Sequence, residues 1–354
     1  MNGDRVLVYH TGSLGDTLVA VPALWAVREN YPHAHIAMLC HEQPGRPLVQ
    51  PRDVLDGSGL IDEYIVYPMG MPLTKAWWLL RQLRSRKFGS LIYLVSSAID
   101  ARRVRRDMLF FRFAGTRRQI GAHGICQPPA THPDTPMSAV PQVAEALLAR
   151  LRADGLQTPP IGLGRLDVGI GERERKNVER WLSELPNDGG RRRFALGLGS
   201  NMPCKIWPPE RYMEVAKHLV DEYDLWPVIF GSSAERDTAI EFVRELGRGH
   251  VAAGALGVRD SMAAMEGCVL FLGNDTGTMH MAAASGVRCI VPFSSRDAPG
   301  KWYPYGEGHI VIRTPVQCEG CMLVRCGEQE MRCILAITVE RVLQACRQAL
   351  GDED

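Results

Sequence analysis

Short apolar runs alternate with amphipathic stretches of helical spacing along the first half of the chain. Apolar runs of this length between polar turns are typical of buried strands. We place strands at residues 5–9, 35–40, 61–67, 90–95 and 117–121, and helices in a segment ending at Asn30, between 69 and 88, and at 140–151. Pro22 lies too deep for a first helical turn, so we expect a kink or a late start there.

The second half repeats the alternation after residues 155–171, a segment rich in glycine and proline that reads as an interdomain linker. Strands that alternate with helices predict parallel sheets with helices on both faces. The sequence therefore predicts an α/β protein with two doubly wound domains. The predicted strands are 193–198, 226–230, one beginning at Val251, 268–272 and 288–292, and the predicted helices are 172–185, 209–223, 231–246, 258–266, 280–285 and 338–350.

Composition limits the classes of protein that the chain can represent. Its 354 residues, 45% of them hydrophobic, are sufficient for two cores. A net charge of +1 provides no global field that would attract nucleic acid. Neither a signal peptide nor a run of roughly 20 apolar residues is found, so we expect a cytoplasmic protein.

A polar turn at 273–280, Gly-Asn-Asp-Thr-Gly-Thr-Met-His, separates a buried strand from a short helix. Gly277 lets a ligand approach the backbone closely, Thr276 and Thr278 offer hydroxyl groups, and free N–H groups at a helix start attract anions. The turn therefore predicts a phosphate cradle, although an ordinary turn capped by Asp275 accounts for the same residues.

Three further loops follow predicted strands, at 10–16, 199–207 and 231–236. Ligands of parallel sheets bind at the carboxyl ends of strands, so we expect all four loops to meet in a cleft. Asp16 is either a general base or a helix cap, and Lys205 either a diphosphate ligand or a solvated lysine. Glu235 and His280 have the same two readings, binding or structural. The dinucleotide motif G-x-G-x-x-G and the Walker A motif are absent.

Four cysteines cluster near the end of the chain with the spacing Cys-x2-Cys-x4-Cys-x6-Cys. Four thiolates suit a closed tetrahedral zinc site, with iron as the second choice. Reduced thiols or a disulfide pair are the alternatives, because cytoplasmic cysteines are mostly reduced. The residues are Cys318, Cys321, Cys326 and Cys333.

Several motifs together resemble the ADP-heptose:lipopolysaccharide heptosyltransferases of glycosyltransferase family nine. They are Gly-Ser-Leu-Gly-Asp-Thr at 12–17 with Pro-Ala-Leu at 22–24, Lys-Ile-Trp-Pro at 205–208, and the turn at 273–280. The resemblance runs nearly end to end and in the same order. It implies a GT-B fold of two Rossmann-like domains, at 1–165 for the acceptor and 166–335 for the donor. We expect the closing helix, 336–354, to pack back on the first domain.

The resemblance also implies a function: inverting transfer of a heptose from ADP-heptose to a hydroxyl group of a glycan such as lipopolysaccharide core. It implies that Asp16 is the general base and that no cofactor is needed for catalysis. The acceptor-side loop would comprise Thr11, Gly12, Ser13 and Gly15. The donor would be bound by Lys205, Glu235, Leu256, Asp275, Thr276, Gly277, Thr278 and His280.

Several alternatives remain open at this point. One alternative is a glycosyltransferase that uses another nucleotide sugar as donor, or a glycolipid, a protein or a metabolite as acceptor. Two others, a nucleotide-sugar epimerase and a non-catalytic binding module, would share the same fold. The proline-rich segment 124–137 and the basic region 75–106 fall in the acceptor half. The basic, tryptophan-bearing helix is either ordinary surface or a peripheral contact with the inner face of an anionic membrane.

Overall fold

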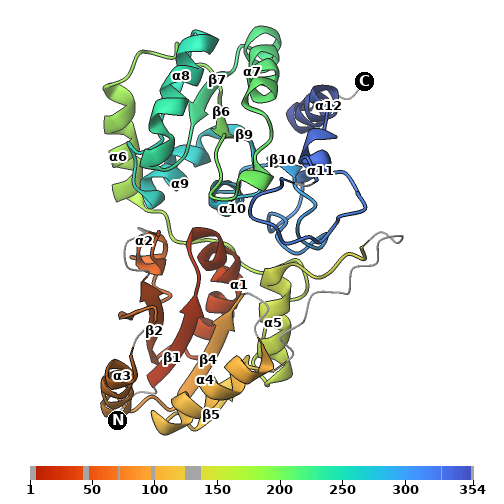
Figure 1. Cartoon of the computed structure of the whole chain (residues 1–354). Coiled ribbons are helices and arrows are strands. Elements are labelled where there is room, and N and C mark those ends of the chain that lie inside the picture. The colour runs from red at the N-terminus through yellow and green to blue at the C-terminus, as the bar shows by residue number, and fades with distance from the viewer. Residues whose placement is uncertain are drawn as a thin grey trace. The chain divides into compact units, whose positions relative to one another are not determined.

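The computed structural model describes residues 5–42, 48–70, 72–96, 100–123, 137–327 and 329–351. The chain divides into two compact units, one of residues 1–128 with 141–169 and one of 129–140 with 170–354. Both are α/β, with a parallel sheet at the centre of each (Figure 1). The proline-rich segment falls outside the described residues, except for Met137.

The first unit contains a parallel sheet of five described strands in the order β3-β2-β1-β4-β5. Apolar residues on one face of this sheet pack against α3 and α4, through Leu79, Leu83 and Phe111. Helices α1 and α5 contact each other. The elements are β1 (Arg5–Thr11), α1 (Leu14–Asn30), β2 (His35–Glu42), α2 (Pro51–Leu55), β3 (Glu63–Pro68), α3 (Leu73–Ser85), β4 (Ser90–Val95), α4 (Ala101–Phe113), β5 (Arg118–Ile120) and α5 (Val143–Ala153).

The second unit contains a parallel sheet of six described strands in the order β11-β10-β9-β6-β7-β8. Its core is formed by buried side chains of the sheet together with Trp207 and apolar residues of α7 and α12. The elements are α6 (Glu172–Ser183), β6 (Arg193–Gly197), η1 (Pro203–Lys205), α7 (Pro209–Tyr223), β7 (Trp226–Ile229), η2 (Ser233–Glu235), α8 (Arg236–Leu246), β8 (His250–Val251), α9 (Val258–Glu266), β9 (Cys268–Gly273), α10 (Gly277–Ala284), β10 (Cys289–Phe293), β11 (Ile310–Arg313), α11 (Arg332–Leu335) and α12 (Val339–Leu350).

Each sheet has one place where the direction of winding reverses. In the first sheet β1 lies between β2 and β4, and in the second β6 lies between β9 and β7. Loops that leave two adjacent strands at such a point run to opposite faces and open a crevice that binds ligands. The loops after β1 and β4 and those after β6 and β9 are therefore the first places to look for a site.

Two expectations from the sequence are wrong in detail. Helix α1 begins at Leu14 and continues through Pro22, so the late start is not observed. Helix α10 begins at Gly277, three residues earlier than predicted. Helix α12 packs within the second unit, where Val342 and Cys346 are buried in the core and the helix contacts α7, β9 and β10, so its packing on the first unit stays a prediction.

Among the described residues, no helix combines the length and the apolar character needed to cross a bilayer.

Candidate functional site

Asn274 joins the two loops that diverge at the reversal point of the second sheet. Its side chain is fully buried, and its Nδ2 atom donates to the Leu198 carbonyl oxygen at 2.8 Å. The Oδ1 atom accepts from the Trp207 backbone N–H and from the Tyr212 hydroxyl, both at 2.9 Å. One side chain thereby fixes the turn after β9 against the loop after β6 and the start of α7.

Lys205 and Asp275 form an ion pair at this junction. The Lys205 Nζ atom lies 2.7 Å from Asp275 Oδ2, and both side chains are almost fully buried. Burial raises the pKa of Asp275, while the ammonium group of Lys205 acts in the opposite direction. The pair holds the Lys205 ammonium group close to the start of α10, where its interactions are little screened by water.

The start of α10 presents hydrogen-bonding groups beside this charge. Thr276 is the N-cap residue, and its hydroxyl oxygen lies 2.7 Å from that of Thr278. A Cβ atom on Gly197 would lie 3.0 Å from Thr278 Oγ1, so the absence of a side chain there lets α10 approach β6. The first N–H groups of a helix lack intrahelical partners. This corner of the sheet therefore suits an anion.

Glu235 lies in the turn that follows β7, the strand next to β6. Its Oε2 atom accepts hydrogen bonds from the Ser232 N–H at 2.7 Å and the Ser232 hydroxyl at 2.6 Å. A Cβ atom built on Gly199 would lie 1.5 Å from Glu235 Oε1, so only glycine leaves room for this carboxylate. Glu235 is thus a cap of its own turn, as the structural reading proposed, and also lines the loop after β6.

Leu256 is half-buried in the turn that leads from β8 to α9. This turn packs closely on η2, because a Cβ atom on Gly254 would lie 2.7 Å from the Ser233 Cα atom. Leu256 therefore lies in the loop after β8, at the same edge of the sheet as Glu235.

His280 is buried in the second turn of α10 and faces the ring of Trp302, with 6.5 Å between ring centroids. Burial, helped by the charge of Lys205, lowers the pKa of His280 to about 3. The imidazole is consequently neutral near pH 7. It can donate or accept a hydrogen bond but adds no positive charge to the site.

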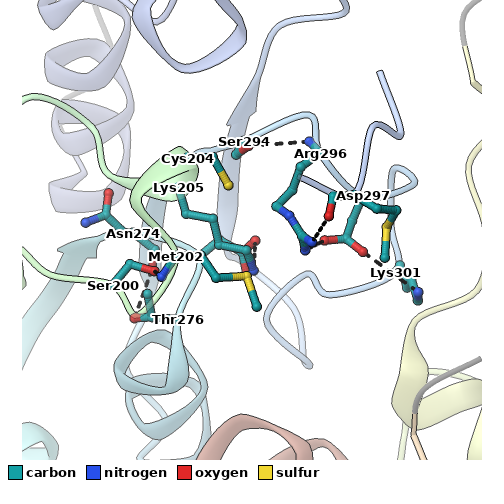
Figure 2. A network of polar contacts seen from close by, with 12 residues as sticks. Ser200, Met202, Cys204, Lys205, Asn274, Thr276, Ser294, Arg296, Asp297 and Lys301 are labelled. Carbon is teal, nitrogen blue, oxygen red and sulfur yellow. Dashed lines mark hydrogen bonds and ion pairs between the residues drawn. The ribbon is translucent and has the colours of Figure 1, made fainter. Parts of the chain in front are cut away.

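A second charged group lies close to Lys205 and was not anticipated from the sequence (Figure 2). The buried Arg296 guanidinium pairs with Asp297, and Lys301 Nζ lies 3.8 Å from Asp297 Oδ1. Arg296 also donates to the backbone carbonyl oxygens of Met322 and Leu323, each at 2.8 Å. Since Cys204 Sγ lies 2.9 Å from the Leu323 oxygen, this network connects the 322–323 loop to the turn that carries Lys205.

Asp16 belongs to the first unit, at the reversal point between β1 and β4. Its Oδ2 atom accepts a hydrogen bond from the Ser13 N–H at 3.1 Å, and its Oδ1 atom accepts one from the Ser96 hydroxyl at 2.5 Å. Ser13 is the N-cap residue of α1. Burial lowers the pKa of nearby His10, so this histidine is neutral. The hydrogen bonds from Ser13 and Ser96 give Asp16 a structural role at the start of α1. A carboxylate has about four lone pairs, so Asp16 can still accept a proton from a substrate.

The remaining residues of the acceptor-side loop surround Asp16. Thr11 ends β1, and Gly15 lies in the first turn of α1. Gly12 has a φ of +153°, and a Cβ atom there would lie 2.2 Å from Asp16 Cβ. The loop thus needs glycine at position 12 to hold the carboxylate where it is. The cleft that would join it to the other three loops stays a prediction.

The four clustered cysteines lie near one another without forming a metal site. Burial raises the pKa of Cys318, and the neighbouring Cys321, Cys333 and Cys326 act in the same direction. Among the described residues, no three histidine, cysteine or acidic side chains are arranged to hold a metal ion. The geometry of these thiols therefore does not fit the predicted zinc or iron site.

The structure brings all eight predicted donor residues to one edge of the second sheet. These are Lys205, Glu235, Leu256, Asp275, Thr276, Gly277, Thr278 and His280. Sequence reasoning missed Asn274, Gly199 and Arg296. A buried amide directly after a strand, beside an acidic residue and a glycine turn, could have indicated Asn274.

Comparison with known proteins agrees with the resemblance seen in the sequence. Residues 167–331 match the family model described as glycosyltransferase family 9 (heptosyltransferase). Lipopolysaccharide heptosyltransferase 2 of Salmonella typhimurium is 29% identical over 160 residues, which are 43% of this chain and 44% of that protein. The match thus spans less than half of this relative's length.

Two solved structures share the fold over almost the whole chain. A family 9 glycosyl transferase from Veillonella parvula has a TM-score of 0.71 at 20% identity, covering 100% of this chain and 99% of its own. The ADP-heptose lipopolysaccharide heptosyltransferase II of Escherichia coli has a TM-score of 0.70 at 22% identity, covering 98% of each chain. The predicted GT-B architecture is therefore confirmed.

Proposed function

We propose that this chain, whose residues 167–331 match the model of glycosyltransferase family 9, transfers a heptose from ADP-heptose to a hydroxyl group of a glycan such as lipopolysaccharide core. The observation that carries this proposal is the meeting of Lys205, the start of α10 and Glu235 at the reversal point of the second sheet. A cation, free N–H groups and a carboxylate are what a nucleotide sugar requires.

The donor diphosphate binds at Lys205 and the start of α10. Backbone N–H groups and the hydroxyl groups of Thr276 and Thr278 contact its oxygens, and Gly277 lets them come close. Asp275 holds the Lys205 ammonium group in position at 2.7 Å. Neutral His280 contributes a hydrogen bond rather than a charge.

The nucleoside and its sugar bind along the adjacent strand ends. Glu235 accepts hydrogen bonds from ribose hydroxyl groups with the oxygen that faces Gly199, and Leu256 provides an apolar contact for the base. An ADP donor is preferred over other nucleotides on the strength of the family alone, so the identity of the base needs a direct test.

Catalysis follows from in-line displacement at the anomeric carbon. The acceptor oxygen forms the new bond as its proton passes to the Asp16 carboxylate, and the bond to the diphosphate breaks with its electron pair leaving on ADP. The anomeric configuration is inverted. Lys205 and the N–H groups of α10 stabilise the charge that grows on the leaving group. None of these steps needs a cofactor.

Three rivals share the fold and much of the site. A glycosyltransferase with another donor, or with a protein or metabolite acceptor, would keep the same donor corner. An epimerase would convert the donor in the absence of any acceptor. A binding module would retain the nucleotide and catalyse nothing.

A donor screen by thermal shift addresses the first rival. Ligands that bind only the folded state raise its melting temperature. We expect ADP and ADP-heptose to stabilise the protein more than UDP- or GDP-sugars, and Lys205→Ala to remove the effect. Equal shifts for all nucleotides, or an undiminished shift in the variant, would reject the assignment.

An acceptor-dependent assay with Asp16→Asn tests the other two rivals, the epimerase and the binding module. Asparagine keeps an oxygen for the Ser13 N–H but cannot take the proton, so we expect ADP binding to persist and transfer to fall by about 10²–10⁴-fold. Asp53→Asn is the matched control, because Asp53 Oδ2 accepts the Gln50 N–H at 2.8 Å in the same capping arrangement. Donor conversion without acceptor would indicate an epimerase.

A further inference from the structure

Helices α3 and α4 lie beside each other on one face of the first sheet. They contact each other, and Arg84 of α3 donates to the Phe113 carbonyl oxygen of α4 at 3.1 Å. Their inner sides are anchored in the core by Leu79, Leu83 and Phe111. The outer sides of both helices are therefore presented together.

Both helices place large apolar side chains on the exposed side. Trp77 and Trp78 on α3 are 59% and 55% exposed, and Leu109 and Phe113 on α4 are 55% and 58% exposed. Removing such apolar side chains from water lowers the free energy, so leaving four of them exposed costs stability unless another surface covers them. Apolar residues grouped on one surface more often mark an interaction site than residues scattered singly.

The same two helices are strongly basic. Together they carry eight lysine and arginine residues and one acidic residue, Asp107, whereas the whole chain has a net charge of +1. Leu109 and Phe113 share their side of α4 with Arg102 and Arg106, because these positions are spaced by three or four residues. On α3, the Arg81 guanidinium lies 4.7 Å from the centre of the Trp77 ring.

We propose that the α3–α4 surface, formed by Trp77, Trp78, Leu109, Phe113 and their flanking arginines, docks on a bilayer rich in anionic phospholipid. Tryptophan side chains favour the headgroup region of a membrane. Clustered lysine and arginine residues are attracted by its negative surface potential. A second copy of this chain would carry the same positive charge and would be repelled.

The surface is independent of the proposed transfer reaction. None of its four apolar side chains belongs to the predicted donor or acceptor loops, and the binding experiment needs neither substrate. Failure of one proposal would therefore leave the other standing.

Co-sedimentation of the full chain with vesicles tests the docking. We expect binding to vesicles that contain phosphatidylglycerol and little binding to pure phosphatidylcholine. Two variants, Trp77→Ser with Trp78→Ser and Arg81→Gln with Arg102→Gln, should each weaken binding by about tenfold or more. Ile161→Ser with Leu163→Ser is the matched control, since these apolar residues of the same unit are 77% and 65% exposed.

Three outcomes would overturn the proposal. They are equal binding to neutral vesicles, no binding to either kind, and equal loss in the control variant. Sedimentation velocity without vesicles tests the alternative that the partner is a second copy of this chain. Self-association that the tryptophan variant abolishes would assign the surface to that second copy. Unchanged ADP-induced thermal shifts in all variants exclude a general folding defect.

Discussion

Lys205 Nζ lies 2.7 Å from Asp275 Oδ2, between the turn after β6 and the turn after β9. The side chains of Lys205 and Asp275 are 11% and 2% exposed, so neither charge is well hydrated. Removing one partner of a buried pair leaves the other uncompensated. The two residues therefore define the electrostatics of this corner as a unit, and changing either one changes what the other can bind.

We expect Asp275→Asn and Lys205→Met each to lower the free energy of unfolding by about 3 kcal/mol. The double variant should lose less than the sum, because no unpaired charge remains. Denaturant unfolding measures all three. Arg175→Met is the control, since Arg175 pairs with Glu266 at the surface and such pairs contribute little. Strict additivity of the two changes would contradict a coupled pair.

Gly199→Ala should interfere with nucleotide binding more than with folding. The new Cβ atom would lie where Glu235 Oε1 now stands, so this flexible carboxylate must turn away. We expect calorimetry to give ADP affinity about tenfold weaker and a melting temperature within a few degrees of the parent.

Gly267→Ala is the control for this substitution, because the nearest atom to its new Cβ would be the Ala264 oxygen at 3.7 Å. ADP affinity unchanged in Gly199→Ala would show that the position of Glu235 does not matter for the nucleoside.

Asn274→Asp should destabilise the second unit strongly although it changes a single atom. The Nδ2 donor to the Leu198 oxygen becomes a second acceptor, and the new charge is fully buried. The cost is about 3 kcal/mol or more. Asn187→Asp is the control, because Asn187 is exposed and its side chain accepts from the Gly189 N–H at the surface. Equal melting temperatures for the two variants would contradict the junction role of Asn274.

The sequence was sufficient to predict ten of the eleven described strands, because each is a short apolar run, but it did not predict β11 (Ile310–Arg313) or the order of the strands that sets each reversal point. Residues 167–331 match the model of the family that the sequence motifs resemble. Lys205 and Asp275 could be named from motifs, yet their pairing could not, since it depends on a contact between loops seventy positions apart.

Other features were beyond reach for physical reasons. The apolar stripe of α12 could pack on either unit, and only the three-dimensional core decides between them. The cysteine spacing suggested a metal, but spacing along a loop does not determine where thiols point. Arg296 belongs to no recognisable motif. It matters because it donates to the backbone oxygens of residues 322 and 323, which are too far away in the sequence for this contact to be predicted.

His280 offers a prediction on pH dependence with a defined sign. Burial and then the charge of Lys205 lower its folded-state pKa to about 3, against an unfolded value of roughly 6.5. A depressed pKa means that the unfolded chain takes up the proton first as the pH falls. The stabilisation from His280 is thus present above pH 6.5 and is lost progressively toward pH 3.

We expect His280→Asn to remove about 2 kcal/mol of the loss in unfolding free energy between pH 7 and pH 5. The variant should retain a smaller residual pH dependence, because His10, which is buried, and His309, which is half-buried, also have lowered pKa values. His33→Asn, at an exposed position, is the control. Nuclear magnetic resonance of the imidazole provides the decisive measurement: titration of His280 near pH 6.5 in the folded protein would mean that it is hydrated and free to carry charge on the donor site.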